Sequence, residues 1–429
     1  MKYRFILIIF IFHLLFLTNL SSEILIPMDL SQNDHLRAYG ITYKALENGL
    51  NSKWLINYRG GSFLIPNSTS IEELCNIWGV YYEKISPQAL LKINQEIEKS
   101  NMDVVYLEKA PEIAVYTLPK EMSGKTKGFA GEPWDDAVTL ALTYAKIPYD
   151  RIYDKEVLRG DLERYDWLHL HHEDFTGQFG KFYAGFRNAN WYKTIIEYER
   201  NIALELGFKK VWQLKHAAVR MIENYVKKGG FLFAMCAATD TYDIALAANG
   251  LDICKSPFDG DPMIKNAEEK LDYDKTFAFK DFTLVKNPFE YEFSSIDASD
   301  YAQIRGAEAD YFTLFEFSAK YDPVPTMLTQ CHVNVINGFL GQTTSYKKKF
   351  VKESVIILGE VEGADEVKYI HGNIGKGTFT FLGGHDPEDY QHKIGDPPTR
   401  LELYKNSPGY RLILNNILFP AAKKKKLKT

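Results

Sequence analysis

The sequence predicts an α/β protein built around a doubly wound, mostly parallel sheet. Apolar strands are expected at 113–117, 167–170 and 231–235. Helical patterns at 134–145 and 211–226 separate them, which is the alternation that βαβ units produce. A chain of 429 residues with 45% hydrophobic and 25% charged residues has the composition of a folded globular protein and can bury a large core.

The first residues predict a signal peptide. Lys2 and Arg4 precede an apolar run over 5–17, which suits a signal core and falls short of the roughly 20 residues of a membrane span. Such a segment would direct export to the periplasm or the extracellular space, with cleavage near Ser22 removing residues 1–22. An uncleaved N-terminal anchor is the alternative. In both cases we expect membrane contact through this segment alone.

Residues 23–110 predict an N-terminal α/β extension in which two strands flank a helix, as in one βαβ-like unit. Arg59-Gly60-Gly61 follows the second strand and is interpreted as a turn that needs glycine conformations. A phosphate- or carboxylate-binding loop is the alternative. The elements expected here are a strand at 24–28, a helix at about 36–46, a strand at 53–58 and amphipathic helical structure over 70–100.

The main domain is predicted in two parts, 111–250 and 331–420, which a large insertion at 251–330 separates. The insertion is rich in Asp, Phe and Tyr and lacks a clean periodicity, so we expect irregular or β structure there. Residues 421–429 form a basic tail that is expected to be solvated. The second part is expected to contain a strand at 355–358, a hairpin of 367–371 and 378–382, and a final helix at 409–418.

Charge and cysteine content limit the partners. With 51 Lys+Arg and 56 Asp+Glu, the net charge of −5 gives no electrostatic footprint for nucleic acid. Four cysteines are too few for a disulfide scaffold. In an exported protein, Cys75, Cys254 and Cys331 could include one disulfide, and the sequence leaves the pair open. We therefore expect a small-molecule partner.

Cys236 is the leading catalytic candidate. It follows the apolar strand 231–235, and a helix is expected to begin directly after it. A sharp strand-to-helix turn needs small residues two places before and after the nucleophile, and Ala234 and Ala238 meet that need. The helix N-terminus would favour a thiolate. The alternative is a small buried cysteine at the end of a core strand.

His385 is the second candidate. It follows the strand predicted at 378–382, so it should lie at the carboxyl edge of the sheet, where ligands bind in open α/β folds. The imidazole can act as a base, with Asp386 or Glu388 fixing its tautomer. The alternative is a histidine that caps a loop while its carboxylate neighbours face solvent.

A run of histidines and carboxylates, His169 to Asp174, offers donors suited to zinc or another divalent metal. In a strand, His169 and His171 share one face and His172 points away. His169 and His171 could therefore join His385. The alternative is a polar loop whose histidines are satisfied by hydrogen bonds. No cofactor is predicted, and His169, His171 and His385 remain the candidates for a divalent metal. The residues expected to bind substrate are His171, His172, Glu173, Gln178 and Gln342.

Segments 112–249 and 352–418 resemble the class I glutamine amidotransferase-like fold, a flavodoxin-like α/β architecture. The resemblance implies Cys236 as nucleophile, His385 as base and Glu388 as orienting acid, acting on a carboxamide through a thioester. The elbow reads Ala-Met-Cys-Ala-Ala where the family has Gly-x-Cys-x-Gly, and Glu388 follows His385 by three residues where the family spacing is two.

Two further resemblances imply other chemistry. The stretch 375–388 is similar to the ThuA family, which shares the fold, lacks the cysteine mechanism and is associated with sugar metabolism. Segments 28–40 and 171–178 resemble exported bacterial proteins labelled asparagine synthetase B, although residue 2 is Lys2, where that enzyme has its catalytic cysteine. The predicted function is a cysteine-dependent amide hydrolase or acyl transferase. A ThuA-like sugar-processing enzyme, with or without assistance from a metal, and a non-catalytic ligand-binding protein are the alternatives.

Overall fold

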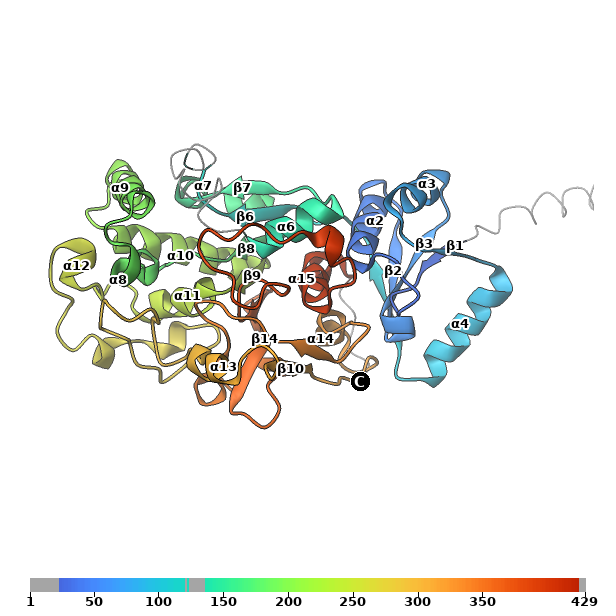
Figure 1. Cartoon of the computed structure of the whole chain (residues 1–429). Coiled ribbons are helices and arrows are strands. Elements are labelled where there is room, and N and C mark those ends of the chain that lie inside the picture. The colour runs from blue at the N-terminus through green and yellow to red at the C-terminus, as the bar shows by residue number, and fades with distance from the viewer. Residues whose placement is uncertain (1–22, 120–121, 123–135, 424–429) are drawn as a thin grey trace, which may run out of the picture.

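The computed structural model describes residues 23–119, 122 and 136–423. Within them the chain forms an antiparallel sheet near the N-terminus and a larger mixed sheet (Figure 1). The predicted signal peptide and residues 424–429 of the predicted tail lie outside the described part. No helix of that part is long and apolar enough to cross a membrane. The predicted α/β class is confirmed.

The N-terminal unit is a five-stranded antiparallel sheet with the order β4-β1-β3-β2-β5. Strands β1 and β2 both run antiparallel to β3, so they point the same way, but β3 lies between them and splits the predicted βαβ-like unit. The helical stretch expected over 70–100 is interrupted, because Gly79 ends α3 at a φ of 72° and Ser86 caps α4. The bounds are β1 (Glu23–Ile26), α2 (His35–Glu47), β2 (Ser52–Ile56), β3 (Ser62–Pro66), α3 (Thr69–Trp78), β4 (Glu83–Ile85), α4 (Pro87–Lys99) and β5 (Asp103–Leu107).

The main sheet has the order β11-β10-β13-β14-β15-β9-β8-β6-β7, with β12 paired to β14. Its half from β15 to β7 is parallel, and the strands from β11 to β15 pair antiparallel. The predicted hairpin is β14–β15, whose ladder reaches the pair Ile374 and Gly377. The strands are β6 (Ile113–Tyr116), β7 (Asp150–Ile152), β8 (Trp167–Leu170), β9 (Phe231–Met235), β10 (Tyr311–Leu314), β11 (Val335–Asn337), β12 (Tyr346–Lys347), β13 (Ile356–Glu360), β14 (Glu366–Ile374) and β15 (Gly377–Leu382).

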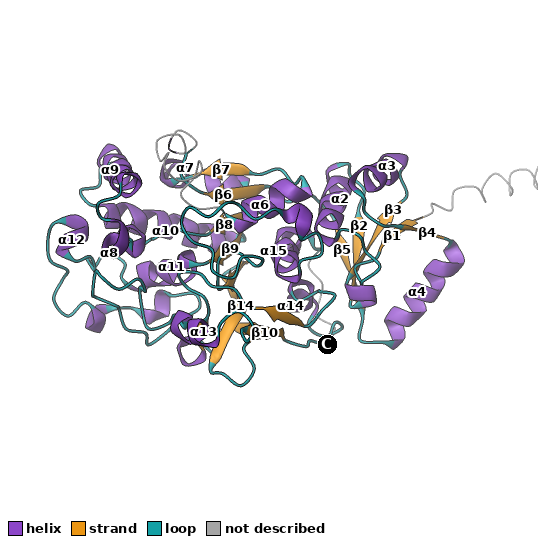
Figure 2. Cartoon of the chain, in the orientation of Figure 1, coloured by secondary structure: helices purple, strands orange, loops and turns teal. Residues whose placement is uncertain are grey.

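Helices cover both faces of the parallel half (Figure 2). In β9, Phe231, Phe233 and Met235 join the hydrophobic cluster of α6 and α15, while Leu232 and Ala234 join that of α10 and α11. This alternation confirms the doubly wound arrangement. Helix α2 packs on α6 and α15, so the N-terminal unit shares the first cluster. The helices are α6 (Ala137–Ala145), α7 (Asp154–Arg159), α8 (Tyr183–Phe186), α9 (Asn190–Glu205), α10 (Val211–Lys228), α11 (Ala237–Ala247), α12 (Ser256–Asp259), α13 (Ser299–Arg305), α14 (Pro323–Leu328) and α15 (Pro408–Leu418).

The segment 251–330 is mostly irregular, as expected, but it also extends the main sheet. Strand β10 pairs with β13 at Thr313 and Glu360. The buried carboxylate of Asp243 on α11 accepts hydrogen bonds from the backbone N–H groups of 277–279, at 2.7 to 2.9 Å, and so ties the insertion to the sheet. The insertion therefore packs on the main domain over one of its helices.

The four cysteines are all free, so the disulfide considered from the sequence is not formed. The turn interpretation of Arg59-Gly60-Gly61 is consistent with the structure. Gly60 has a φ of 77°, and a Cβ added there would lie 2.4 Å from the Met28 carbonyl oxygen. The close backbone approach therefore requires glycine.

Candidate functional site

Cys236 occupies a strained strand-to-helix turn. Strand β9 ends at Met235 and α11 begins at Ala237, and the cysteine between them has φ 51° and ψ −138°. A non-glycine residue in this region costs about 1–3 kcal/mol and persists where its surroundings hold it. Ala234 and Ala238 are fully buried on either side of the turn, as the elbow interpretation requires.

Cys236 lines a cavity, and its side chain is almost fully buried. Its Sγ accepts a hydrogen bond from the backbone N–H of Gln342 at 3.2 Å, and the side chain is 4% exposed. Burial raises the pKa of the thiol to about 11, against the opposing effect of the backbone N–H groups of Gln342 and Ala237. The cysteine is therefore a neutral thiol at neutral pH.

The cavity has a volume of about 670 Å³ and opens at the carboxyl edge of the parallel strands. Cys236 and His385 both line it, so the two predicted groups meet there. Aromatic side chains of the segment after β8 and of the insertion form another part of its wall. The lining residues are His172, Phe182, Phe186, Cys236, Tyr291, Gln303, Leu340, Gly341, Gln342, His385, Gln391, His392, Lys393 and Ile394.

Several imidazoles pack against one another beside the cavity. Ring centroids lie 4.0 Å apart for His171 and His172, 4.6 Å for His172 and His385, and 4.7 Å for His171 and His385. His392 stacks on the other side of His385 at 4.6 Å. Burial lowers the pKa of His171, and burial with the neighbouring imidazoles holds that of His385 well below its usual range. Both rings are therefore neutral at physiological pH.

His172, and not His169, joins His385. Strand β8 ends at Leu170, so the alternation assumed for a continuing strand does not extend to His171 and His172. His169 lies deeper, where its Nδ1 is 3.1 Å from the Phe233 carbonyl oxygen. The structure thus corrects the expected trio by one residue.

Asp136 is a member of the site that the sequence reasoning missed. Its Oδ1 accepts hydrogen bonds from the N–H groups of Val138 and Thr139, at 2.8 and 2.9 Å, and caps α6. The same carboxylate lies 3.3 Å from Nε2 of His169 and 3.4 Å from Nδ1 of His171. Burial alone would raise the pKa of Asp136, but these imidazoles hold it well below its usual range. An Asp at the start of a predicted helix was the available signal.

The structure does not bring Glu388 to His385. Among the described residues no hydrogen bond joins them, and Glu388 lines a separate hollow beside Ser407. Burial raises the pKa of the Glu388 carboxyl, with the Ser407 hydroxyl opposing. Asp386 is engaged as well, since its carboxylate accepts hydrogen bonds from the Glu388 N–H at 2.9 Å and the Thr399 hydroxyl at 2.7 Å. The expected triad is therefore not assembled.

The expected substrate-binding polar residues serve mainly to hold loops. Glu173 accepts the His171 N–H at 2.7 Å, and burial raises its pKa to about 8. Gln178 donates to the Thr176 hydroxyl at 2.9 Å within its own loop. Gln342 lines the cavity, but its side-chain amide donates to the carbonyl oxygens of residues 180 and 291. Of the expected set, His172 and Gln342 line the cavity.

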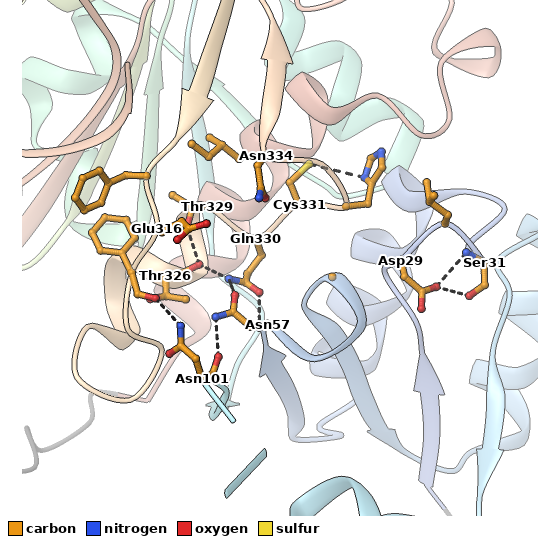
Figure 3. A pocket seen from close by; sticks show the side chains of 16 residues that line it. Asp29, Ser31, Asn57, Asn101, Glu316, Thr326, Thr329, Gln330, Cys331 and Asn334 are labelled. Atoms are coloured by element: carbon orange, nitrogen blue, oxygen red, sulfur yellow. Dashed lines mark hydrogen bonds between the residues drawn. The ribbon is translucent and has the colours of Figure 1, made fainter. Parts of the chain in front are cut away.

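A second cavity of about 810 Å³ lies between the N-terminal unit and the segment 314–334 (Figure 3). Its amides are used to join the two parts. Gln330 accepts the Asn57 N–H at 2.7 Å and donates to the Asn57 side chain at 3.1 Å, and Asn101 donates to the Phe317 carbonyl oxygen at 3.0 Å. We therefore regard this cavity as a structural junction.

Comparisons with known proteins give distant similarities. No protein-family model matches the chain, and no curated protein matches it. Cytoplasmic proteins STM3548 and STM1381 of Salmonella typhimurium are each 11% identical, with a TM-score of 0.33, and cover 75% of this chain and 91% of their own. Gan42B, a GH42 beta-galactosidase, is 13% identical over 65% of this chain, with a TM-score of 0.28, and the chain spans 28% of its length. Similarities at this level leave the function to be argued from the site.

Proposed function

We propose that the chain is an exported enzyme with a class I glutamine amidotransferase-like architecture, which transfers or hydrolyses the acyl group of a small amide. The supporting observation is the strained turn at Cys236, which places a thiol in the same cavity as His172 and His385. Strain of this kind is maintained at functional sites and has no packing advantage for a plain core cysteine.

The reaction would follow the chemistry of a thiol nucleophile. Sγ of Cys236 attacks the acyl carbon while an imidazole of the cavity, His385 or His172, accepts the thiol proton. The C–N bond breaks, the amine leaves with that proton, and water or a second acceptor then cleaves the thioester. The N–H of Gln342, 3.2 Å from the sulfur, stabilises negative charge on it.

The proposed reaction uses a cysteine and a histidine without the third residue. Because the Glu388 carboxylate lies elsewhere, stacking between His172 and His392 sets the orientation of the His385 ring. The thiol pKa of about 11 lies far above that of the buried imidazole, so proton transfer from the thiol to the imidazole is uphill. Substrate or a further positive charge must close this gap.

A ThuA-like sugar-processing activity is the second candidate. It is favoured by the grouping of His171, His172 and His385, which offers metal-ligating nitrogens that a pure cysteine enzyme does not need. A sugar substrate would also find aromatic faces on the cavity wall, at Phe182 and Tyr291.

The test is a screen of the mature chain against small amides and glycosides. The Cys236→Ala variant should lose amide turnover and labelling by a thiol-reactive glutamine analogue, whereas Cys331→Ala, which removes a thiol from the other cavity, should keep both. Unchanged amide turnover in Cys236→Ala would reject the nucleophile. Glycoside turnover that survives this change would favour the second candidate, and ligand binding without any turnover would favour a non-catalytic protein.

A further inference from the structure

We infer that His171, His172 and His385 form a binding site for a divalent metal ion of the zinc type. One nitrogen of each ring lies within 4.8 Å of one nitrogen of each of the other two. Three nitrogens bound to zinc at its usual distance lie about 3.3 Å from one another, so a small inward movement of the rings would close them around an ion. Imidazole donors suit zinc, and three of them match a catalytic zinc site.

The unpaired nitrogens point to an ion more than to a structural role. His171 is 1% exposed and His385 is 7% exposed. Nε2 of His171 and both ring nitrogens of His385 have no hydrogen-bond partner among the described residues. Ring stacking accounts for the faces of these imidazoles but leaves the buried nitrogens unsatisfied, which is unfavourable. A cation would satisfy them.

Carboxylates around the imidazoles favour a positive charge. Asp136 lies behind His171, with Oδ1 3.4 Å from Nδ1, which leaves Nε2 for the ion. A carboxylate in this position orients a ligating histidine and makes it a better donor. Asp386, fully buried after β15, also acts on His171 through its charge. The negative charges of these carboxylates would offset the positive charge of the ion.

The predicted ion would lie at the wall of the cavity that contains Cys236. His172 and His385 line that cavity together with the cysteine, so a position left open by three protein ligands would face the substrate. There the ion would polarise a substrate carbonyl beside the sulfur. This use of the ion rests on the proposed function, whereas the binding of the ion does not.

The test measures metal binding directly. The mature chain without an affinity tag is stripped with a chelator and titrated with Zn²⁺ in competition with a chromophoric chelator, and Co²⁺ is used to record the ligand-field spectrum. We expect one ion per chain, and at least about 100-fold weaker binding in His172→Ala and in His385→Ala. His332→Ala, which removes an imidazole from the other cavity, should bind as the wild type does. Circular dichroism checks that each variant is folded. The Co²⁺ spectrum of the wild type tests the site even if a variant fails to fold.

Two results would overturn the proposed ion site. Absence of stoichiometric Zn²⁺ binding by the wild type would overturn the site, as would equal binding by His172→Ala and His385→Ala. Cys236→Ala should bind Zn²⁺ with wild-type affinity. Zinc binding without any turnover would contradict the proposed function and keep the ion site, whereas amide turnover by a chain that binds no zinc would do the reverse.

Discussion

Replacement of Asp136 by asparagine separates two roles of one side chain. Asp136 caps α6 through Oδ1 and presents its charge to His169 and His171. Asparagine caps a helix about as well as aspartate, so the substituted side chain retains the acceptor oxygen and loses the charge. We therefore expect weaker metal binding in a variant that keeps the helix cap.

The magnitude follows from the position of the carboxylate behind a ligand. Loss of such a partner weakens a metal site by about 10- to 100-fold, which corresponds to about 1.4–2.7 kcal/mol. Asp136→Asn should keep the cap of α6, whereas Asp136→Ala also loses the cap and with it about 1 kcal/mol of stability.

The assay is the Zn²⁺ competition titration, combined with urea unfolding of the metal-free protein. Asp34→Asn is the matched control. Asp34 caps α2 by accepting the Arg37 N–H at 2.9 Å, and it is not among the residues that line the cavity of Cys236 and His385. This control should bind zinc as the wild type does. Wild-type zinc affinity in a folded Asp136→Asn variant would refute the positioning role of the carboxylate.

Three further predictions follow from the buried groups. In metal-free protein Cys236 should react slowly with iodoacetamide at pH 7 and much faster above pH 10, because burial raises the pKa of its thiol to about 11. Peptide mapping by mass spectrometry gives the rate. A fast reaction at pH 7 would contradict the raised pKa. Glu388→Gln should leave amide turnover unchanged, since the carboxylate does not contact His385. A large loss of amide turnover would instead support Glu388 as the third residue of a triad. Burial lowers the pKa of Lys368 to about 8, so between that value and the unfolded pKa of about 10.4 the unfolded chain holds the extra proton and stability rises with pH. Urea unfolding should show a smaller rise in Lys368→Met than in the wild type.

The elbow and its strand were predictable because their signals are local. The run 231–235 is apolar throughout, and both of its faces are buried against helices. Ala234 and Ala238 satisfy a steric condition that is written in the sequence itself. His385 was predictable for the same reason, since it follows directly on an apolar strand.

The positions of the carboxylates after β15 and the set of proposed metal ligands were not predictable, because they depend on the path of the chain after a strand ends. Asp386 turns inward, where its carboxylate accepts from Thr399, and Glu388 points to Ser407. His172 enters the cavity because β8 stops at Leu170, so period-two alternation no longer applies. No local sequence pattern predicts the path of the chain after β15 or after β8.

The cavity itself is a consequence of strand order. Strands β15, β9 and β8 are neighbours and parallel, so their carboxyl ends lie at one edge of the sheet. Within three residues of these ends come His385, Cys236 and the pair His171 and His172. The thiol and the imidazoles are therefore held on the rigid core of the sheet, whereas Glu388 lies beyond a further turn. The placement of the nucleophile and of the proposed metal ligands thus follows from β-sheet pairing, and it stands whether or not a carboxylate completes a triad.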